Sequence, residues 1–380
     1  MANELNIKWK DEKAAAYYLN ANNLHEIHPM INARETPFIE WYAADKLKIK
    51  AHTAIKIIND NVHKVFQTGN SDVIIDIDDN LDTGSIAAGT DYYVYICDEE
   101  DGTASIVISA NSSYPSGYDA DSSRKIGGFH TLCVANGTIG GHDLTGFLAG
   151  AILPASVWDL THRPECEPEG MVWSEKAQIW VDIYLQSGTG ASTVSVYGAT
   201  ITDTRTWFDH LDDMAAVGKR LLHDHEFQVI AGGSNEETNI AGSADPVTTG
   251  GHSDTASRRM ISNIGCEDCC GALWQWLLDG GYRFDGAANH THQVTVSGDP
   301  ETVTSGNPSG DVAPAWDWYD LPGSKGSLYR QGTYGNIRFL AGGYWNAGTV
   351  CGSRSRHAAG YPWVAGSDIA GRGCARSRNT

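Results

Sequence analysis

The chain has 380 residues, enough for two or three domains and for a core that needs no disulfide support. Its 27 basic and 47 acidic residues give a net charge of −20, which argues against binding to nucleic acid or to anionic membranes. No apolar run reaches the ~20 residues that span a membrane, and the sequence begins without the apolar core of a signal peptide. We therefore expect a soluble protein that binds no nucleic acid and does not insert into membranes.

The composition is typical of a loop-rich β protein. Glycine (42) and proline (12) are frequent, whereas 41% hydrophobic residues and 12 tryptophans exclude disorder. Eight cysteines are too few for a disulfide scaffold in a chain of this length, so we interpret them as free thiols.

The first 48 residues differ from the rest. Residues 11–19 favour a helix, and Pro29 and Pro37 prevent a regular element from continuing beyond it. We predict that residues 1–48 form a small N-terminal module for oligomerisation or attachment.

From about residue 50 the apolar pattern has a period of two. Ile75 and Ile77 alternate with neighbours that are expected to face solvent, and further β-type runs occupy 91–97 and 105–108. Glycine-containing turns separate these runs, as in an all-β sandwich. We predict such a sandwich over residues 49–155.

The remainder of the chain, 156–380, mixes strands and helices, which predicts an α+β domain. Residues 178–184 are strand-like, and Trp207 and Met214 lie on one face of a predicted helix. A second helix is expected to start near Asp224, which would serve as its N-cap.

A zinc site is the most specific metal hypothesis that the sequence supports. Residues 266–270 read Cys-Glu-Asp-Cys-Cys, and His290 and His292 are spaced as two residues on one face of a strand. The alternative is that these thiols pack against Trp274 and Trp276, which we favour because the second half of the pattern departs from usual zinc spacing. Pairing of one of these cysteines with a distant cysteine stays open.

Catalytic and other metal motifs are weak or absent. The run 223–226, His-Asp-His-Glu, fits the start of a helix better than a metal site, and 76–80 fits a hairpin end better than a calcium loop. No nucleophile elbow, Walker A or dinucleotide fingerprint is present. We predict no catalytic residue, no cofactor and no metal.

The segment 341–380 has an unusual composition. It contains no Lys, Glu, Gln or Met, and its charges are five arginines against Asp368 alone. Small, aromatic and polar residues are scattered along it without the apolar period of an ordinary core. We interpret it as a surface of special composition.

Several motifs together resemble a known family. Gly-Ala-Leu-Trp-Gln-Trp at 271–276, Gly-Lys-Arg-Leu at 218–221, Gly-Gly-Tyr-Trp at 342–345 and Ile-Ala-Gly-Arg at 369–372 resemble the formylglycine-generating-enzyme branch of the C-type lectin fold. Within that branch the chain is similar to the variable proteins of diversity-generating retroelements, of the phage tropism-determinant type. The similarity covers about residues 50–380 and includes Lys-Ile-Gly-Gly-Phe-His at 125–130.

The resemblance implies an α+β C-type lectin domain over 156–380, with a variable region at about 341–380, preceded by the sandwich and the N-terminal module. In this family a retroelement mutates adenines, mostly at Asn codons, which cannot yield Lys, Glu, Gln, Met or Trp. The composition of 341–380 fits that rule, with Trp345 and Trp363 as unmutated scaffold. By alignment, the diversified, ligand-binding positions are Tyr344, Asn346, Ala347, Val350, His357, Ala359, Gly360, Tyr361, Val364, Gly366 and Asp368.

The implied function is recognition of variable targets by this C-terminal face. The expected partner is a protein or glycan receptor on a host cell surface, and the expected location is the tip of a virion tail fibre or another extracellular-facing position. The resemblance also implies a homotrimer, and the long Gly/Ser/Thr-rich stretch 232–257 is a candidate for contacts between subunits.

Two other functions stay open as alternatives. A formylglycine-generating oxidase uses two cysteines spaced C-x4-C, which align with Ala347 and Gly352, although Cys351 is one position away. The other alternative is a structural virion or cell-surface protein that uses the lectin fold as a spacer.

Overall fold

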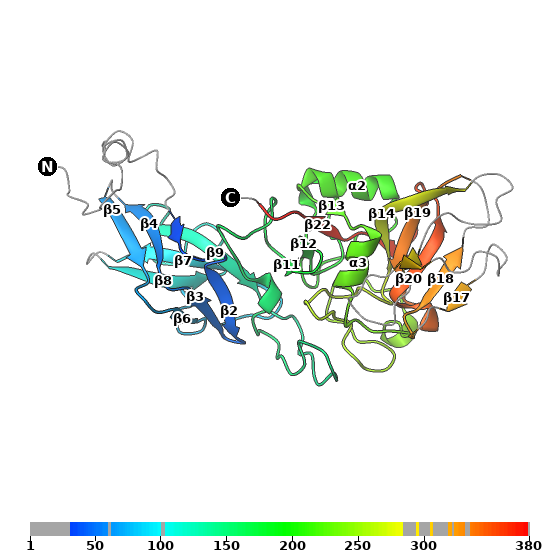
Figure 1. Ribbon diagram of the computed structural model, residues 1–380, viewed down its shortest axis with the longest axis horizontal. Coiled ribbons are helices and arrows are strands. Elements are labelled where there is room, and N and C mark those ends of the chain that lie inside the picture. Colours follow the sequence, from blue (N-terminus) through cyan, green and yellow to red (C-terminus); the bar gives the residue numbers. More distant parts are fainter. Residues whose placement is uncertain are drawn as a thin grey trace.

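The computed structural model describes residues 31–59, 62–99, 103–283, 294–295, 305–306, 318–320, 323–330 and 335–378. Figure 1 shows an elongated molecule with two lobes, an N-terminal lobe (31–159) and a C-terminal lobe (171–378), joined by irregular chain. The helix expected over 11–19 lies outside the described residues.

The N-terminal lobe consists of antiparallel strands in three sheets, ordered β1-β4-β5, β2-β3-β6 and β10-β9-β7-β8. Their core contains the side chains of Ile75 and Ile77, whereas Ile74 is exposed and Asp76 is half-buried, so the predicted alternation is confirmed. The runs predicted as strands over 91–97 and 105–108 are also confirmed. The strands are β1 (Ile31–Ala33), β2 (Ile39–Ala43), β3 (Lys46–Ile49), β4 (Thr53–Asn59), β5 (Val62–Gln67), β6 (Val73–Asp76), β7 (Asp91–Asp98), β8 (Ala104–Ser109), β9 (Ser123–His130) and β10 (Trp158–Asp159).

We expected a domain boundary near residue 48, but strand pairing and core packing continue across this position. All four residues of β3, Lys46 to Ile49, pair with β6, and Ile39 and Leu47 lie in the same core as Ile75. Buried apolar side chains therefore tie residues 39–49 to the sheets that come after them in the chain.

The C-terminal lobe combines two sheets with two helices (Figure 1), in sheet orders β11-β12-β22-β13 and β17-β18-β20-β19-β14-β21. The elements are β11 (Met171–Ser174), β12 (Ile179–Asp182), α2 (Trp207–Ala216), β13 (Arg220–Leu221), α3 (Asp224–Ile230), β14 (Trp274–Arg283), β17 (Trp318–Asp320), β18 (Ser327–Arg330), β19 (Gly335–Gly342), β20 (Gly352–Gly360), β21 (Ile369–Ala370) and β22 (Gly373–Ala375). A short ladder, β15 (Val294–Thr295) with β16 (Ser305–Gly306), and four 3-10 turns, η1 (Pro154–Ser156), η2 (Gly190–Ser192), η3 (Ala241–Ser243) and η4 (Gly348–Val350), complete the described elements.

Both predicted helices of this lobe are present. Helix α2 starts with a capping box, in which Thr206 and Asp209 bond reciprocally to each other's backbone N–H. Helix α3 starts at Asp224, but the cap residue is His223, whose N–H donates to the Glu226 carboxylate at 2.7 Å. The prediction of Asp224 as N-cap is therefore wrong, because its buried carboxylate forms an ion pair with Arg356.

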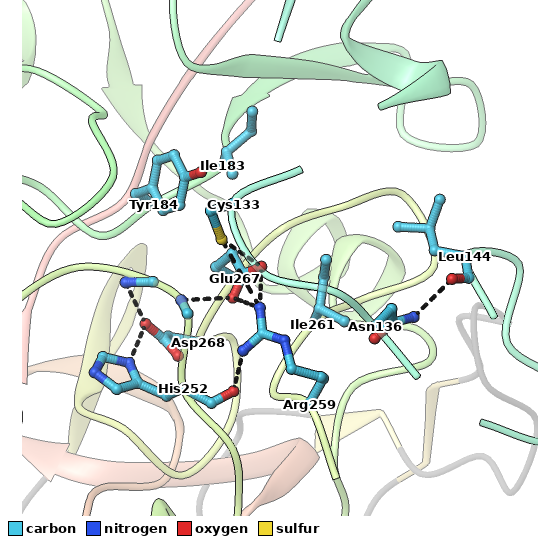
Figure 2. Close-up of polar contacts among 12 residues, drawn as sticks. Cys133, Asn136, Leu144, Ile183, Tyr184, His252, Arg259, Ile261, Glu267 and Asp268 are labelled. Carbon is cyan, nitrogen blue, oxygen red and sulfur yellow. Dashed lines mark hydrogen bonds and ion pairs between the residues drawn. The ribbon is translucent and has the colours of Figure 1, made fainter. Parts of the chain in front are cut away.

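The stretch 232–257 has η3 as its one regular element, and side chains hold it to the lobe. Figure 2 shows His252 beside Asp268, with Nδ1 and Oδ2 2.9 Å apart, and Arg259 donating to both oxygens of Glu267 at 2.6 and 2.8 Å. Arg259 also donates to the carbonyl oxygen of His252. Because Arg259, Glu267 and Asp268 are buried, these contacts fix the half-buried His252, and with it the end of the stretch, at low dielectric. Its expected contact between subunits stays a prediction.

A buried series of polar contacts also joins the two lobes. Nδ1 of His130 lies 2.8 Å from the Asp91 carboxylate, and Nε2 lies 3.0 Å from the hydroxyl of Tyr184. Tyr93 of β7 and Trp180 of β12 belong to one buried cluster. The N-terminal lobe therefore supports the C-terminal lobe through packed and hydrogen-bonded contacts.

All eight cysteines are free and buried. Cys266, Cys269 and Cys270 lie in the core of the C-terminal lobe, and His290 and His292 of the zinc hypothesis lie outside the described residues. Within the described ranges, no group of three or more His, Cys, Asp or Glu side chains is placed to hold a metal. Across the same ranges, the helices are too short or too polar to cross a membrane.

Candidate binding surface

Two arginines of the segment 341–380 point into the lobe. The Arg354 guanidinium donates to the carbonyl oxygen of Gln228 at 2.7 Å, and Arg356 forms an ion pair with Asp224 at the start of α3. Both arginines are 1% exposed. Because a buried guanidinium needs acceptors, these residues fix β20 against α3 and are unavailable to a partner.

Arg372 performs the same role next to β22. Its guanidinium donates to Oε1 of Gln275 at 2.8 Å and to the carbonyl oxygens of Asp182 at 2.8 Å, Ile183 at 2.6 Å and Glu267 at 2.5 Å. Four acceptors from three separate segments thus meet at one side chain. The arginines that distinguish 341–380 in composition are, in these three cases, part of the frame.

Two glycines turn the chain out of β19 toward the surface. Gly342 and Gly343 have φ angles of 91° and 87°, which residues other than glycine rarely adopt. A Cβ at Gly342 would overlap the carbonyl oxygen of Cys269, and one at Gly343 would lie 2.6 Å from Sγ of Cys351. The close approach at this corner requires glycine at both positions.

The next residues form a tight loop that ends in η4. The N–H of Ala347 donates to the carbonyl of Tyr344 at 3.0 Å, and the N–H of Val350 donates to that of Ala347 at 3.1 Å. Asn346 is exposed, whereas Tyr344, Ala347 and Val350 are half-buried. The Tyr344 ring stacks on Trp274, with centroids 6.3 Å apart. This loop presents its side chains on a rigid backbone.

Strand β20 carries three of the predicted positions, His357, Ala359 and Gly360. His357 is half-buried beside Trp274, and burial lowers the pKa of its imidazole to about 4. Gly360 is buried, and a Cβ there would lie 2.9 Å from both the Trp276 ring and the carbonyl oxygen of Arg338. As it stands, Gly360 cannot touch a partner. The side chain of Ala359 lies outside what the structure describes.

The turn after β20 carries the remaining positions. Val364 is exposed, and Tyr361, Gly366 and Asp368 are half-buried. Burial raises the pKa of Asp368, and the negative charge of Asp245 adds to that shift. Trp363, expected to be scaffold, is instead 61% exposed. The rings of Tyr344 and His357 lie against Trp274, and the N–H of Trp274 donates to the carbonyl of Asp368 at 2.8 Å. The loop 344–350, the ring of His357 and the end of the turn 361–368 therefore meet at Trp274.

Sequence reasoning missed two residues beside this surface. Phe208 on α2 is 49% exposed, and Asp245 of the stretch 232–257 is near enough for its charge to raise the pKa of Asp368. The signal for Phe208 was available, because it lies off the apolar face that Trp207 and Met214 define. No signal in the sequence could identify Asp245, because only tertiary packing brings it near Asp368.

The oxidase alternative has little support from this geometry. The positions that align with its cysteines, Ala347 and Gly352, carry no thiol. Burial raises the pKa of Cys351 to about 12, and its thiol donates to the carbonyl of Tyr344 at 3.5 Å. A protonated, buried thiol is a poor nucleophile.

Comparison with known proteins points in one direction. Residues 38–159 match the family described as "Mtd second domain". The chain is 29% identical over 280 residues to a "Tail fiber receptor-binding protein" of Bordetella phage BPP-1, which covers 67% of this chain and 70% of that protein.

Solved structures agree with this similarity. The U1 and P3c variants of the Major Tropism Determinant are each 25% identical with a TM-score of 0.68, covering 94% of this chain and 88% of theirs. The shared fold consists mostly of β-strands in several sheets, with few helices. The resemblance to phage tropism determinants is thus confirmed, and the chain is a homologue of the major tropism determinant.

Proposed function

We propose that this chain is the receptor-binding protein of a phage tail fibre and determines which hosts the phage attaches to. The observation that carries the proposal is the similarity to a tail fibre receptor-binding protein, which extends over 67% of the chain. The protein is part of the virion, binds a protein or glycan receptor on the host surface, and catalyses nothing. The half-exposed loop 344–350 and turn 361–368 are the face that binds.

We further propose a C-type lectin domain over residues 156–380, diversified by a retroelement within 341–380. The difference in burial between two groups of side chains in 341–380 supports this proposal. Arg354, Arg356 and Arg372 are buried in the frame, whereas Asn346 and Val364 are exposed on it. A frame that does not depend on its exposed positions tolerates their replacement.

We also propose that the protein acts as a homotrimer, with the stretch 232–257 contributing to contacts between subunits. Three linked sites would raise attachment by about 10²–10⁴ over a single modest contact. Light scattering tests this directly, and a stable monomer at micromolar concentration would contradict it.

The receptor proposal is tested by binding to cells of the host on which the encoding phage plates. The purified chain should bind these cells, and the double variant Asn346→Ala, Val364→Ala, at two exposed positions, should lose at least tenfold in affinity with an unchanged melting temperature. The matched control is Tyr42→Ala with Tyr114→Ala, two exposed side chains of the N-terminal lobe. Equal binding by both variants would contradict the proposed face.

The diversification proposal is tested in the genome. A reverse transcriptase gene and a near-copy of the segment encoding 341–380, differing at adenines, should lie beside this gene. Absence of both would remove diversification and leave receptor binding in place.

A further inference from the structure

Three large apolar side chains are exposed on two segments that a backbone hydrogen bond joins at the binding surface. Trp363 is 61% exposed, Phe208 49% and Val364 38%. Trp363 and Val364 belong to the turn after β20, whereas Phe208 lies on α2, outside the segment 341–380. Exposed single apolar residues are ordinary, but a cluster from two elements marks an interaction site.

The cluster is held rigidly before any partner arrives. The rings of Tyr361 and Trp363 are nearly parallel, at 8°, with centroids 5.1 Å apart. The N–H of Val364 donates to the carbonyl of Tyr361 at 2.9 Å and closes the turn between them. A preformed aromatic surface loses little conformational entropy on binding.

Helix α2 and the turn are fixed to each other. The N–H of Trp207 donates to the carbonyl of Pro362 at 3.0 Å, and Nε1 of Trp207 donates to the carbonyl of Leu277 at 2.8 Å. Phe208 comes directly after Trp207, and Trp363 directly after Pro362. This hydrogen bond therefore holds the backbones of Phe208 and Trp363 close to each other.

The charges around the cluster are mostly acidic. Asp212 is exposed four residues after Phe208, on the same face of α2. Asp368 and the exposed Asp245 lie at the far end of the turn. The opposing positive charges are Arg338, which lies over the Trp207 ring at 4.4 Å, and Arg205, which forms an ion pair with Asp213. With a net charge of −20, a second copy of this chain would bring like charges together and is disfavoured as the occupant.

Resting on the proposed function, we propose that Trp363 and Phe208 form a constant anchor, which receives an apolar side chain from a protein partner with a basic surrounding surface. A glycan is the less suitable occupant, because the cluster presents aliphatic Val364 and the ring of Phe208 in place of a set of hydrogen-bonding groups. Trp is among the side chains that most often dominate the binding energy of protein interfaces once a partner buries it. The anchor supplies affinity common to all targets, and the predicted variable positions around it supply the choice among them.

A display library of the full chain tests this proposal. Residues 208 and 363 are randomised together with Tyr344, Asn346, Ala347 and Val350, and one pool is selected for binding to hen lysozyme, a basic protein. Two parallel pools are selected on yeast mannan and for protease resistance alone. We expect aromatic residues at 363 to be enriched at least fivefold in the lysozyme pool over the protease pool, with a smaller enrichment at 208.

Equal frequencies at 363 in the lysozyme and protease pools would overturn the anchor, and so would enrichment confined to the mannan pool. Failure of both the lysozyme and the mannan pools to yield binders would contradict the proposed function as well, so the two failures are distinguishable. In an isolated lysozyme binder, Trp363→Ala should weaken binding at least tenfold and Trp363→Phe at most threefold, both with unchanged melting temperature. Tyr42→Ala, a 53% exposed aromatic of the N-terminal lobe, is the matched control and should change nothing.

Discussion

The imidazole of His357 lies against the indole of Trp274, with 5.8 Å between the ring centroids. Trp274 is 3% exposed and belongs to a buried cluster with Trp276 and Leu340. A position expected to vary is thus packed on the core that supports it. Substitution there acts on stability as well as on recognition.

The first prediction is a pH dependence that His357 confers. The unfolded chain protonates this imidazole near pH 6.5, whereas burial lowers its pKa to about 4 in the folded chain. Since the unfolded state binds more protons between these values, the contribution of His357 to stability is complete above pH 6.5 and falls as the pH drops to about 4. His357→Gln should flatten urea unfolding midpoints over this range. The exposed His225, changed to Gln, is the control, and equal slopes for both variants would contradict the assignment.

The second prediction concerns the ion pair that holds β20 to α3. Arg356→Met leaves the buried carboxylate of Asp224 without its cation and should cost about 3–5 kcal/mol of unfolding free energy. Arg376→Met, at an exposed position, should change it by no more than about 0.5 kcal/mol. Chemical denaturation measures both values. Similar losses would mean that the ion pair does not stabilise the packing of β20 on α3.

The third prediction compares two glycines that share a positive φ. Gly342→Ala places a Cβ on the carbonyl oxygen of Cys269 and should cost about 3 kcal/mol or more, as overpacked cores do. Gly348→Ala meets nothing within 4 Å and should cost about 1–2 kcal/mol, from backbone strain alone. Thermal unfolding of the pair separates the two effects, and equal shifts would argue against the close approach at Gly342.

The fourth prediction separates frame from surface. Asn346→Ala and Val364→Ala should each change the unfolding free energy by no more than about 0.5 kcal/mol, because both side chains are exposed. Trp274→Ala should cost about 3–5 kcal/mol, because it empties a buried site. Losses of similar size in the two sets would contradict the assignment of Asn346 and Val364 to the surface and of Trp274 to the core.

The sequence predicts local structure well where side chains repeat with a fixed period. The alternation at Ile75 and Ile77 predicted β6, and the spacing of Trp207 and Met214 predicted α2. In both elements one face packs on a core, so burial imposes its period on the sequence.

Long-range contacts were out of reach of the same reasoning. Asp224 and Arg356 are 132 residues apart, so the first was interpreted as a helix cap and the second as part of a variable segment. Gly360 is buried because strand β20 pairs with β19 in a register that a single sequence does not reveal. Trp363 was expected to be scaffold because of its residue type, yet its exposure depends on the turn that carries it.

Strand β22 lies between β12 and β13 and bonds to both, although it comes after every other described strand in the sequence. During translation, β12 and β13 must therefore wait with unpaired edges until residues 373–375 leave the ribosome. Open strand edges template aggregation. A premature stop codon between positions 344 and 372 should consequently yield insoluble protein in place of a shortened receptor-binding product, so incomplete copies would be withheld from virion assembly.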